Sequence, residues 1–295
     1  MTQFVQNLID GLGNGSTYAL LAVGVSMLFG VMHLVNFAHG ELLTIGAYVI
    51  YGMRSNDISW WATIPVAILS AVMLSMLIEF VAFRRVRTAS AFTLLLTSFA
   101  IEILSHAAWR IGVSSTPRRF EAPDIAFKVV EIGPFNIEVW DVVSIAVAVA
   151  CFIGTAIMLR TTMFGLSIRA ASEDFDAARL MGVKANRVIS GAFAFAGLLA
   201  GIAGAIWLVR RGQADPRMGA EPLLKAVIAA IIGGLGSLPG AVVGGLSLGI
   251  AEVYFRSWLP SDLQGLTDSF VFVVIAILFV VRPQGLFNVQ SAERV

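Results

Sequence analysis

The stretch Val139–Leu159 reads Val-Trp-Asp-Val-Val-Ser-Ile-Ala-Val-Ala-Val-Ala-Cys-Phe-Ile-Gly-Thr-Ala-Ile-Met-Leu, and the polar segment Arg160–Arg187 follows it. A helix that crosses the hydrocarbon core of a bilayer needs about 20 mostly apolar residues, which this run supplies. Hydrophobic residues make up 58% of the 295 residues, charged residues make up 13%, and the mean hydropathy is +0.85. A soluble domain has about 25% charged residues. The sequence therefore predicts an all-α, polytopic membrane protein.

Apolar runs of this kind recur along the chain and predict a single helical-bundle domain, residues 1–295, with about eight or nine membrane segments. The runs are Ser16–Val35, Glu41–Met53, Trp60–Phe83, Ala91–Ile111, Val139–Leu159, Val188–Val209, Pro222–Gly234, Ala241–Trp258 and Leu266–Val281. The second and the seventh are too short to cross a bilayer alone, and each adjoins a polar or Gly-rich break. Such short pieces are typical of discontinuous helices in transporters, although two ordinary loops between tilted helices are an equal alternative.

The basic loop Arg84-Arg85-Val86-Arg87 contains no acidic residue and indicates the cytoplasmic side of the membrane. Arg160–Arg187 and the tail after Arg282 then lie on that same side, and the long loop Gly112–Glu138 lies on the other. The total count of Lys and Arg is nearly equal on the two sides. The local density of arginines in the first loop decides the predicted orientation, together with the character of Ser172–Gly182 as a docking segment.

The polar segment Arg160–Arg187 contains the pattern of a short helix over Ser172–Gly182. Ser172 is a suitable N-cap, because its hydroxyl can accept a hydrogen bond from an unpaired amide of the first turn. Glu173 and Asp176 then lie at the positive end of the helix dipole. Gly182 suits the left-handed position that follows a helix.

Small and apolar side chains share one face of this predicted helix: Ala177, Leu180 and Met181 have the spacing i, i+3, i+4. Ala178 adds a further small position, where a partner's surface would leave little room for a larger side chain. A short capped helix outside the bilayer with an apolar patch is typical of a segment that docks into a groove on another protein.

Polar residues cluster at the first break, where Asn36, His39 and Glu41 flank Gly40. Polar groups at membrane depth are costly and usually face a cavity or one another. Together with Gly236 and Ser237 of the second break, these residues are candidates for the lining of a translocation path. An equally weighted alternative is a network that only caps the broken helix and touches no substrate.

The sequence contains no pattern for catalysis or for binding of a cofactor. It has no P-loop, no His-Glu-x-x-His or paired-Cys zinc motif, and a single cysteine, Cys151. Glu102 and His106 have i, i+4 spacing and are able to pair, but they form no recognisable charge relay. A formal net charge of +1 gives no indication of nucleic-acid binding. The chain is therefore expected to have no enzymatic activity and no cofactor of its own.

Several motifs taken together resemble a known family. Asp176-Ala177-Ala178-Arg179-Leu180-Met181-Gly182 resembles the Glu-Ala-Ala-x-x-x-Gly loop by which ABC-importer permeases engage their ATPase subunits, with Asp in place of Glu. Further segments resemble the LivH family of branched-chain amino acid ABC permeases, in order along nearly the whole chain: Gly15–Leu20, Asn36–Glu41, Gly233–Ala241, Gly249–Glu252 and Arg282–Phe287. Glu102 and His106 match no motif of that family.

The resemblance implies a multi-pass subunit of the bacterial inner membrane, embedded in lipid, that imports leucine, isoleucine, valine or a related small amino acid or amide. It also implies four kinds of partner subunit: a second, homologous LivM-like permease, two cytoplasmic LivG- and LivF-like ATPases that bind ATP and Mg²⁺, and an external solute-binding protein. The alternative from another class is a stand-alone channel or facilitator for a small polar solute. A capped docking helix would have no purpose in such a protein.

Overall fold

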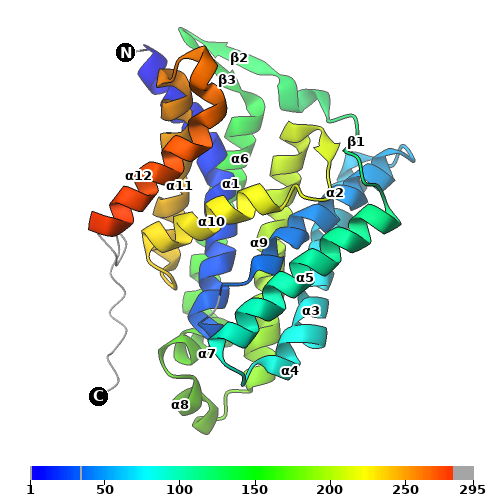
Figure 1. Ribbon diagram of the computed structural model, residues 1–295, viewed down its shortest axis with the longest axis vertical. Helices are drawn as coiled ribbons and strands as arrows, with labels where there is room; N and C mark the ends of the chain where they lie inside the picture. The colour runs from blue at the N-terminus through cyan, green and yellow to red at the C-terminus, as the bar shows by residue number, and fades with distance from the viewer. Residues whose placement is uncertain (1, 34, 282–295) are drawn as a thin grey trace.

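The computed structural model describes residues 2–33 and 35–281, which are mostly helical (Figure 1). The α-helices are α1 (Thr2–Met32), α2 (Glu41–Arg54), α3 (Trp60–Ile78), α4 (Arg84–Val86), α5 (Ala91–Gly112), α6 (Val139–Thr161), α7 (Met163–Glu173), α8 (Phe175–Leu180), α9 (Ala185–Arg211), α10 (Ala220–Gly233), α11 (Leu238–Trp258) and α12 (Thr267–Val281). Short 3₁₀ helices are η1 (Phe37–Gly40), η3 (Asp124–Phe127) and η4 (Ser261–Leu266), and η2 (Glu79–Phe83) is a π-helix.

The predicted all-α membrane bundle is confirmed. Within the described residues, six helical segments are long and apolar enough to cross a membrane: α1, α3 with its continuation to Val86, α5, α6, α9 and α11. Each of the nine predicted apolar segments contains a helix, and the second and seventh are the short helices α2 and α10, with 14 residues each. The ninth predicted segment, Leu266–Val281, contains α12, which has 15 residues.

The first predicted segment, Ser16–Val35, was placed too late, because α1 begins at Thr2. Close packing rather than hydropathy explains the early start. A Cβ on Gly11 would lie 2.7 Å from the Cα of Ile250, and a Cβ on Gly15 would lie 2.9 Å from the Cα of Leu246. The first half of α1 is therefore held against α11, where small residues allow two helix backbones to approach closely.

The core lies around α1 and α9, which run through the middle of the molecule (Figure 1). In the 18-residue apolar stretch of each helix, 83% of the residues are buried in α1 and 72% in α9. The corresponding share is only 11% in α5 and 22% in α6. The helices α5 and α6 therefore present most of their apolar side chains outward. That is the expected arrangement in lipid, where an outward-facing apolar side chain needs no protein partner.

Two antiparallel strand pairs mark one end of the molecule, and α4, α7 and α8 mark the other (Figure 1). Strand β2 (Val129–Ile132) pairs with β3 (Phe135–Glu138), and β1 (Arg118–Arg119) pairs with β4 (Gln213–Ala214). The loops that contain Arg84–Arg87 and Arg160–Arg187 thus lie at the same end, opposite Gly112–Glu138, as the sequence predicts. The tail after Arg282 lies outside the described residues.

Candidate functional site

The first helix break follows α1, and Asn36 caps what comes next. The Oδ1 atom of Asn36 accepts a hydrogen bond from the Ala38 amide at 3.0 Å, which makes Asn36 the N-cap of η1. Its side chain is buried, with only 4% of the residue exposed. Asn36 therefore satisfies backbone at the break, and this contact is the one that the capping alternative predicts.

Gly40 brings this break against the start of α10. A Cβ at Gly40 would lie 2.7 Å from the carbonyl oxygen of Gly219 and 3.2 Å from a methyl group of Leu223. Only a residue without a side chain fits there, since a real Cβ essentially never approaches an oxygen so closely. The N-terminal ends of the two short helices α2 and α10 are thus in close contact.

His39 is wholly enclosed between helices. None of its surface is exposed, and neither ring nitrogen has a hydrogen-bond partner among the described residues. Its Nε2 faces α1, where a Cβ on Gly24 would lie 3.0 Å away, and the Ala196 carbonyl of α9 lies close to the same point. The side chain faces neither lipid nor an open path in this structure, which departs from the path-lining role considered for it.

The second break, between α10 and α11, lies against the same helix as the first. Gly234 and Gly236 have positive φ angles of 91° and 86°, and the Gly236 amide donates to the hydroxyl of Ser26 in α1 at 3.2 Å. Ser237 N-caps α11 through the Gly240 amide at 3.1 Å. All of these residues serve local backbone geometry.

The positions that touch the two breaks on α1, Gly24 and Ser26, are two residues apart. Two positions in an α-helix differ by about 3 Å in height and by about 200° around the axis. The two breaks therefore lie at nearly the same depth, on different sides of α1. The sequence grouped residues of both breaks as candidates for the lining of one translocation path. In the structure, the central helix α1 lies between the two breaks.

Glu41, the first residue of α2, is the centre of a buried polar contact with α5. Only 1% of Glu41 is exposed, and its Oε2 accepts a hydrogen bond from Trp109 Nε1 at 2.7 Å. The His106 Nε2 lies 2.9 Å from Glu41 Oε1, although the angles fall outside hydrogen-bond geometry. His106 thus contacts Glu41 rather than Glu102, the partner suggested by helical spacing.

A second buried charge cluster joins α10 to α1 and α11. Lys225 Nζ lies 3.1 Å from Glu252 Oε1 and 3.1 Å from Glu221 Oε1, and the Tyr18 hydroxyl donates to Glu252 Oε2 at 2.8 Å. Arg256 completes the cluster at 3.4 Å from Glu252. Lys225 is 3% exposed, so its charge depends on these partners. Sequence reasoning missed this lysine, although a single Lys inside an otherwise apolar helix was a sufficient signal.

The predicted docking helix is in fact two helices, and its cap was misassigned. Ser172 lies inside α7, and its hydroxyl donates to the Arg169 carbonyl at 2.8 Å instead of capping. Asp174 is the N-cap of α8, because its Oδ1 accepts from the amides of Asp176 and Ala177 at 3.0 Å each. Asp and Ser are comparable N-cap residues, and in the structure it is Asp174, two residues after Ser172, that lies between the two helices.

The C-terminus of α8 agrees with the prediction. Gly182 has a φ of 89°, its amide donates to the Arg179 carbonyl, and the Val183 amide donates to the Ala178 carbonyl. These two bonds form a Schellman motif, in which a left-handed glycine closes a helix. Glu173 belongs to the end of α7 and is exposed.

Side chains on α8 divide into an inward and an outward set. Ala178 is 5% exposed and packs against this chain, so its predicted contact with a partner is wrong for the structure as it stands. Leu180 and Met181 are 90% and 86% exposed, and Ala177 and Asp176 are exposed beside them. The apolar pair that is free to meet a partner is therefore Leu180 with Met181.

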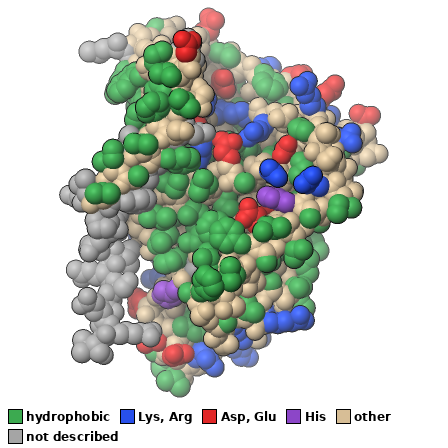
Figure 2. All heavy atoms as spheres, viewed as in Figure 1, with side chains coloured by type: hydrophobic (Ala, Val, Ile, Leu, Met, Phe, Trp, Pro, Cys, Tyr) green, Lys and Arg blue, Asp and Glu red, His purple; other side chains and the backbone are tan. Residues whose placement is uncertain are grey.

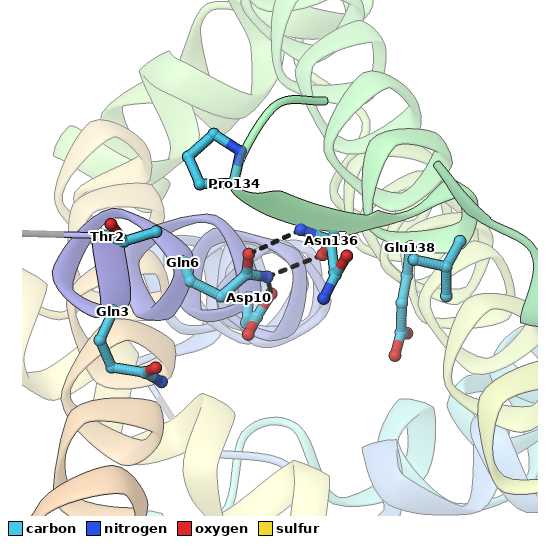
Figure 3. A pocket seen from close by; sticks show the side chains of 8 residues that line it. Thr2, Gln3, Gln6, Asp10, Pro134, Asn136 and Glu138 are labelled. Atoms are coloured by element: carbon cyan, nitrogen blue, oxygen red, sulfur yellow. Dashed lines mark hydrogen bonds between the residues drawn. The ribbon is translucent and has the colours of Figure 1, made fainter. Parts of the chain in front are cut away.

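A small polar pocket lies at the opposite end of the molecule, between the start of α1 and the β2–β3 hairpin (Figure 3). Gln6 fixes the hairpin there, because its side-chain amide bonds both the carbonyl and the amide of Asn136, at 2.8 and 3.1 Å. Asp10 and Glu138 contribute carboxylates to a cavity of about 360 Å³. No group of three or more His, Cys, Asp or Glu side chains in the described chain is arranged to hold a metal ion.

The chain matches a known protein family and several known proteins. The model of the family described as "Branched-chain amino acid transport system / permease component" matches residues 7–281. The high-affinity branched-chain amino acid transport system permease protein LivH of Salmonella typhimurium is 30% identical, over 99% of this chain and 98% of its own. The corresponding protein BraD of Pseudomonas aeruginosa is 28% identical, over 99% and 98%.

Among solved structures, an inward-facing putative metal-chelate type ABC transporter aligns with 94% of this chain and 84% of its own, at 17% identity and a TM-score of 0.48. The matched family model spans both helix breaks, the buried charge cluster and the α7–α8 segment. The chain belongs to the family of permease components of branched-chain amino acid transport systems.

Proposed function

We propose that this chain is the membrane-spanning subunit of an ABC importer that moves branched-chain amino acids inward across the inner membrane of a bacterium. The substrate class is supported by LivH and BraD, both named as permease proteins of high-affinity branched-chain amino acid transport systems. A related small amino acid or amide is the nearest alternative substrate. The chain has no P-loop, so the energy source must be supplied by other subunits.

The observation that carries this proposal is the exposed apolar pair on α8. Leu180 and Met181 are 90% and 86% exposed on a short helix that is capped at both ends and lies outside the apolar spans. Full burial of such a side chain is worth about 1.5–3 kcal/mol. A rigid helix that leaves two of them open fits a groove on an ATPase, with which α8 would form the coupling contact.

The proposed assembly contains two LivG- and LivF-like ATPases, which bind ATP and Mg²⁺, a second LivM-like permease and an external solute-binding protein. The break at Asn36–Glu41 precedes the start of α2, and the break at Gly234–Ser237 follows the end of α10. Irregular backbone at membrane depth survives only where protein or a cavity surrounds it. We infer that these breaks position the two short helices beside the translocation path, and that Gly236 and Ser237 act there as supports.

The test is uptake by vesicles that contain this chain with its co-purifying ATPases, screened over leucine, isoleucine, valine and small amides. Leu180→Glu should weaken ATPase association at least about tenfold, since each 1.4 kcal/mol is a factor of ten. Ile111→Glu is the matched control, because Ile111 is 87% exposed at the end of α5, far from α8. Full association and uptake in Leu180→Glu would refute α8 as the coupling helix.

The same experiment separates the second candidate, a stand-alone facilitator. Such a protein would equilibrate its solute across the membrane without ATP and without the ATPases. Uptake that proceeds in vesicles containing this chain alone, at the rate measured with the full assembly, would favour the facilitator. Strict dependence on ATP supports the importer.

A further inference from the structure

An apolar groove runs along the outer surface of α3. It has a volume of about 670 Å³ and is lined by side chains from α2, α3, η2, α4 and α9. Its upper walls are apolar or nearly so and include Ile45, Ser70, Met73, Leu77 and Phe80. Met73, Leu77 and Phe80 are each more than half exposed, so the described part of the chain leaves this groove open.

The dimensions of the groove match one leaflet of a bilayer. From Ser70 to Arg84 the helix rises by about 21 Å at roughly 1.5 Å per residue. One half of the hydrocarbon core measures about 15 Å. The groove therefore has room for an acyl chain along its apolar part, and a lipid of one leaflet's length lying there would place its headgroup at the last turn.

The lower end of the groove is polar and fixed in place. Arg84 donates to the Glu79 carboxylate at 2.7 and 3.1 Å and to the Ser190 hydroxyl at 2.9 Å, and its guanidinium carbon lies 4.8 Å from the centre of the Phe80 ring. Glu79 is 1% exposed, whereas the Arg84 side chain is 33% exposed. The π-helical turn η2 carries Glu79 and Phe80, and such turns often occur at functional sites.

Positive charge surrounds this polar end. Arg85 follows Arg84 in the chain and is exposed at the rim, although it does not line the groove itself. Arg87 hydrogen-bonds to Asn186 at the start of α9, which also carries Lys184 and Arg187. The segments 80–90 and 184–190 contain no acidic residue. Lys and Arg side chains are visible at the end of the molecule that carries α4 (Figure 2). Basic pockets between membrane helices at this depth are suited to anionic lipid headgroups.

We propose that this groove binds one anionic phospholipid, with an acyl chain along α3 and its phosphate at Arg84 and Arg85. Charge complementarity distinguishes this occupant from a second permease. The basic residues at the rim, with no acidic residue in segments 80–90 and 184–190, favour an anionic headgroup over the apolar face of a second permease. The bound lipid belongs to the leaflet on the side of α7 and α8, and its headgroup lies where α3 meets α9. The proposal does not depend on the transported solute.

The test is native mass spectrometry of the full chain in detergent, titrated with dioleoyl phosphatidylglycerol and, separately, with dioleoyl phosphatidylcholine. The anionic lipid should bind more tightly to one saturable site. Arg85→Gln should lower its affinity by about fivefold, because one basic residue near an anionic headgroup is worth about 1 kcal/mol. Arg169→Gln, an exposed arginine of α7 at the same end, is the matched control and should leave the affinity unchanged.

A second pair of variants tests the groove itself. Ser70→Trp should reduce binding of both lipids, because an indole would fill the upper groove. Leu104→Trp, at a 68% exposed position on α5, should not. Equal affinity for the two headgroups, or unchanged binding in both Arg85→Gln and Ser70→Trp, would overturn the proposal. So would loss of the bound lipid when the ATPases or a second permease join, since a protein would then be the occupant.

Discussion

At the scale of single residues, the buried charge cluster on α10 is a costly feature for a membrane-spanning chain. Lys225 and Glu252 are 3% and 4% exposed and lie 3.1 Å apart, with Tyr18, Glu221 and Arg256 around them. Removal of one member of a buried pair typically costs about 3–5 kcal/mol, whereas replacement of both is often nearly neutral. Loss of one charge should therefore weaken the packing of α10 against α1 and α11 more than replacement of both.

Lys225→Met should accordingly destabilise the protein by about 3–5 kcal/mol in reversible unfolding from detergent micelles. The double variant with Glu252→Gln should recover at least about 1 kcal/mol relative to the sum of the single changes. Arg179→Met removes the exposed ion pair with Asp176, at 62% and 87% exposure, and should cost no more than about 1 kcal/mol. Additive costs for the buried pair would contradict a direct interaction.

At the scale of helices, glycine spacing decides how closely neighbouring elements pack. In α11, Gly245 packs against the backbone of Ala19, and Gly249 packs against the backbone of Gly15. In α9, Gly197 and Gly201 approach the backbone of α3. Small residues at such positions allow two helix backbones to approach closely in lipid.

Gly249→Ala should therefore separate α11 from α1 and destabilise the protein by about 1–3 kcal/mol, as overpacking of a tight contact does. Gly154→Ala in α6 is the matched control, because no atom lies within 4 Å of the Cβ that it would add. Helix propensity alone favours alanine over glycine by about 1 kcal/mol, so the control should be neutral or stabilising. Thermal unfolding of both variants measures the contrast, and equal shifts would refute close α1–α11 packing.

Local patterns predicted the helices well because each depends on nearby residues. Apolar runs found all nine segments, and Gly182 was correctly placed as a left-handed helix end. The N-cap of α8 was predicted at Ser172 but is Asp174. Both residue types suit an N-cap, and sequence alone does not rank two such neighbours.

Contacts between distant segments were the part that the sequence did not predict. Glu41 meets His106 and Trp109 across helices α2 and α5, and Lys225 meets Tyr18 across more than half the chain. Helical spacing shows only which residues share a face of one helix. The partner of that face depends on packing, which is why His106 was paired with Glu102 and why Ala178 was assigned to an outside partner.

At the scale of the whole molecule, α8 and the loop Gly112–Glu138 lie at opposite ends (Figure 1). Basic loops remain preferentially on the cytoplasmic side, so Arg84–Arg87 predicts that the α8 end lies in the cytoplasm. This orientation is also the one that allows Leu180 and Met181 to meet a cytoplasmic ATPase.

Single cysteines at Asp176 and Ser115, each in a Cys151→Ala background, test this orientation. Both positions are exposed, and they lie in α8 and in the opposite loop. In intact cells a membrane-impermeant maleimide should label Ser115→Cys and leave Asp176→Cys unlabelled, and in inverted vesicles the order should reverse. Labelling of Cys151→Ala alone sets the background. If both cysteines react from one face, the number of crossings between them is even rather than odd, and α6 does not cross the membrane as proposed.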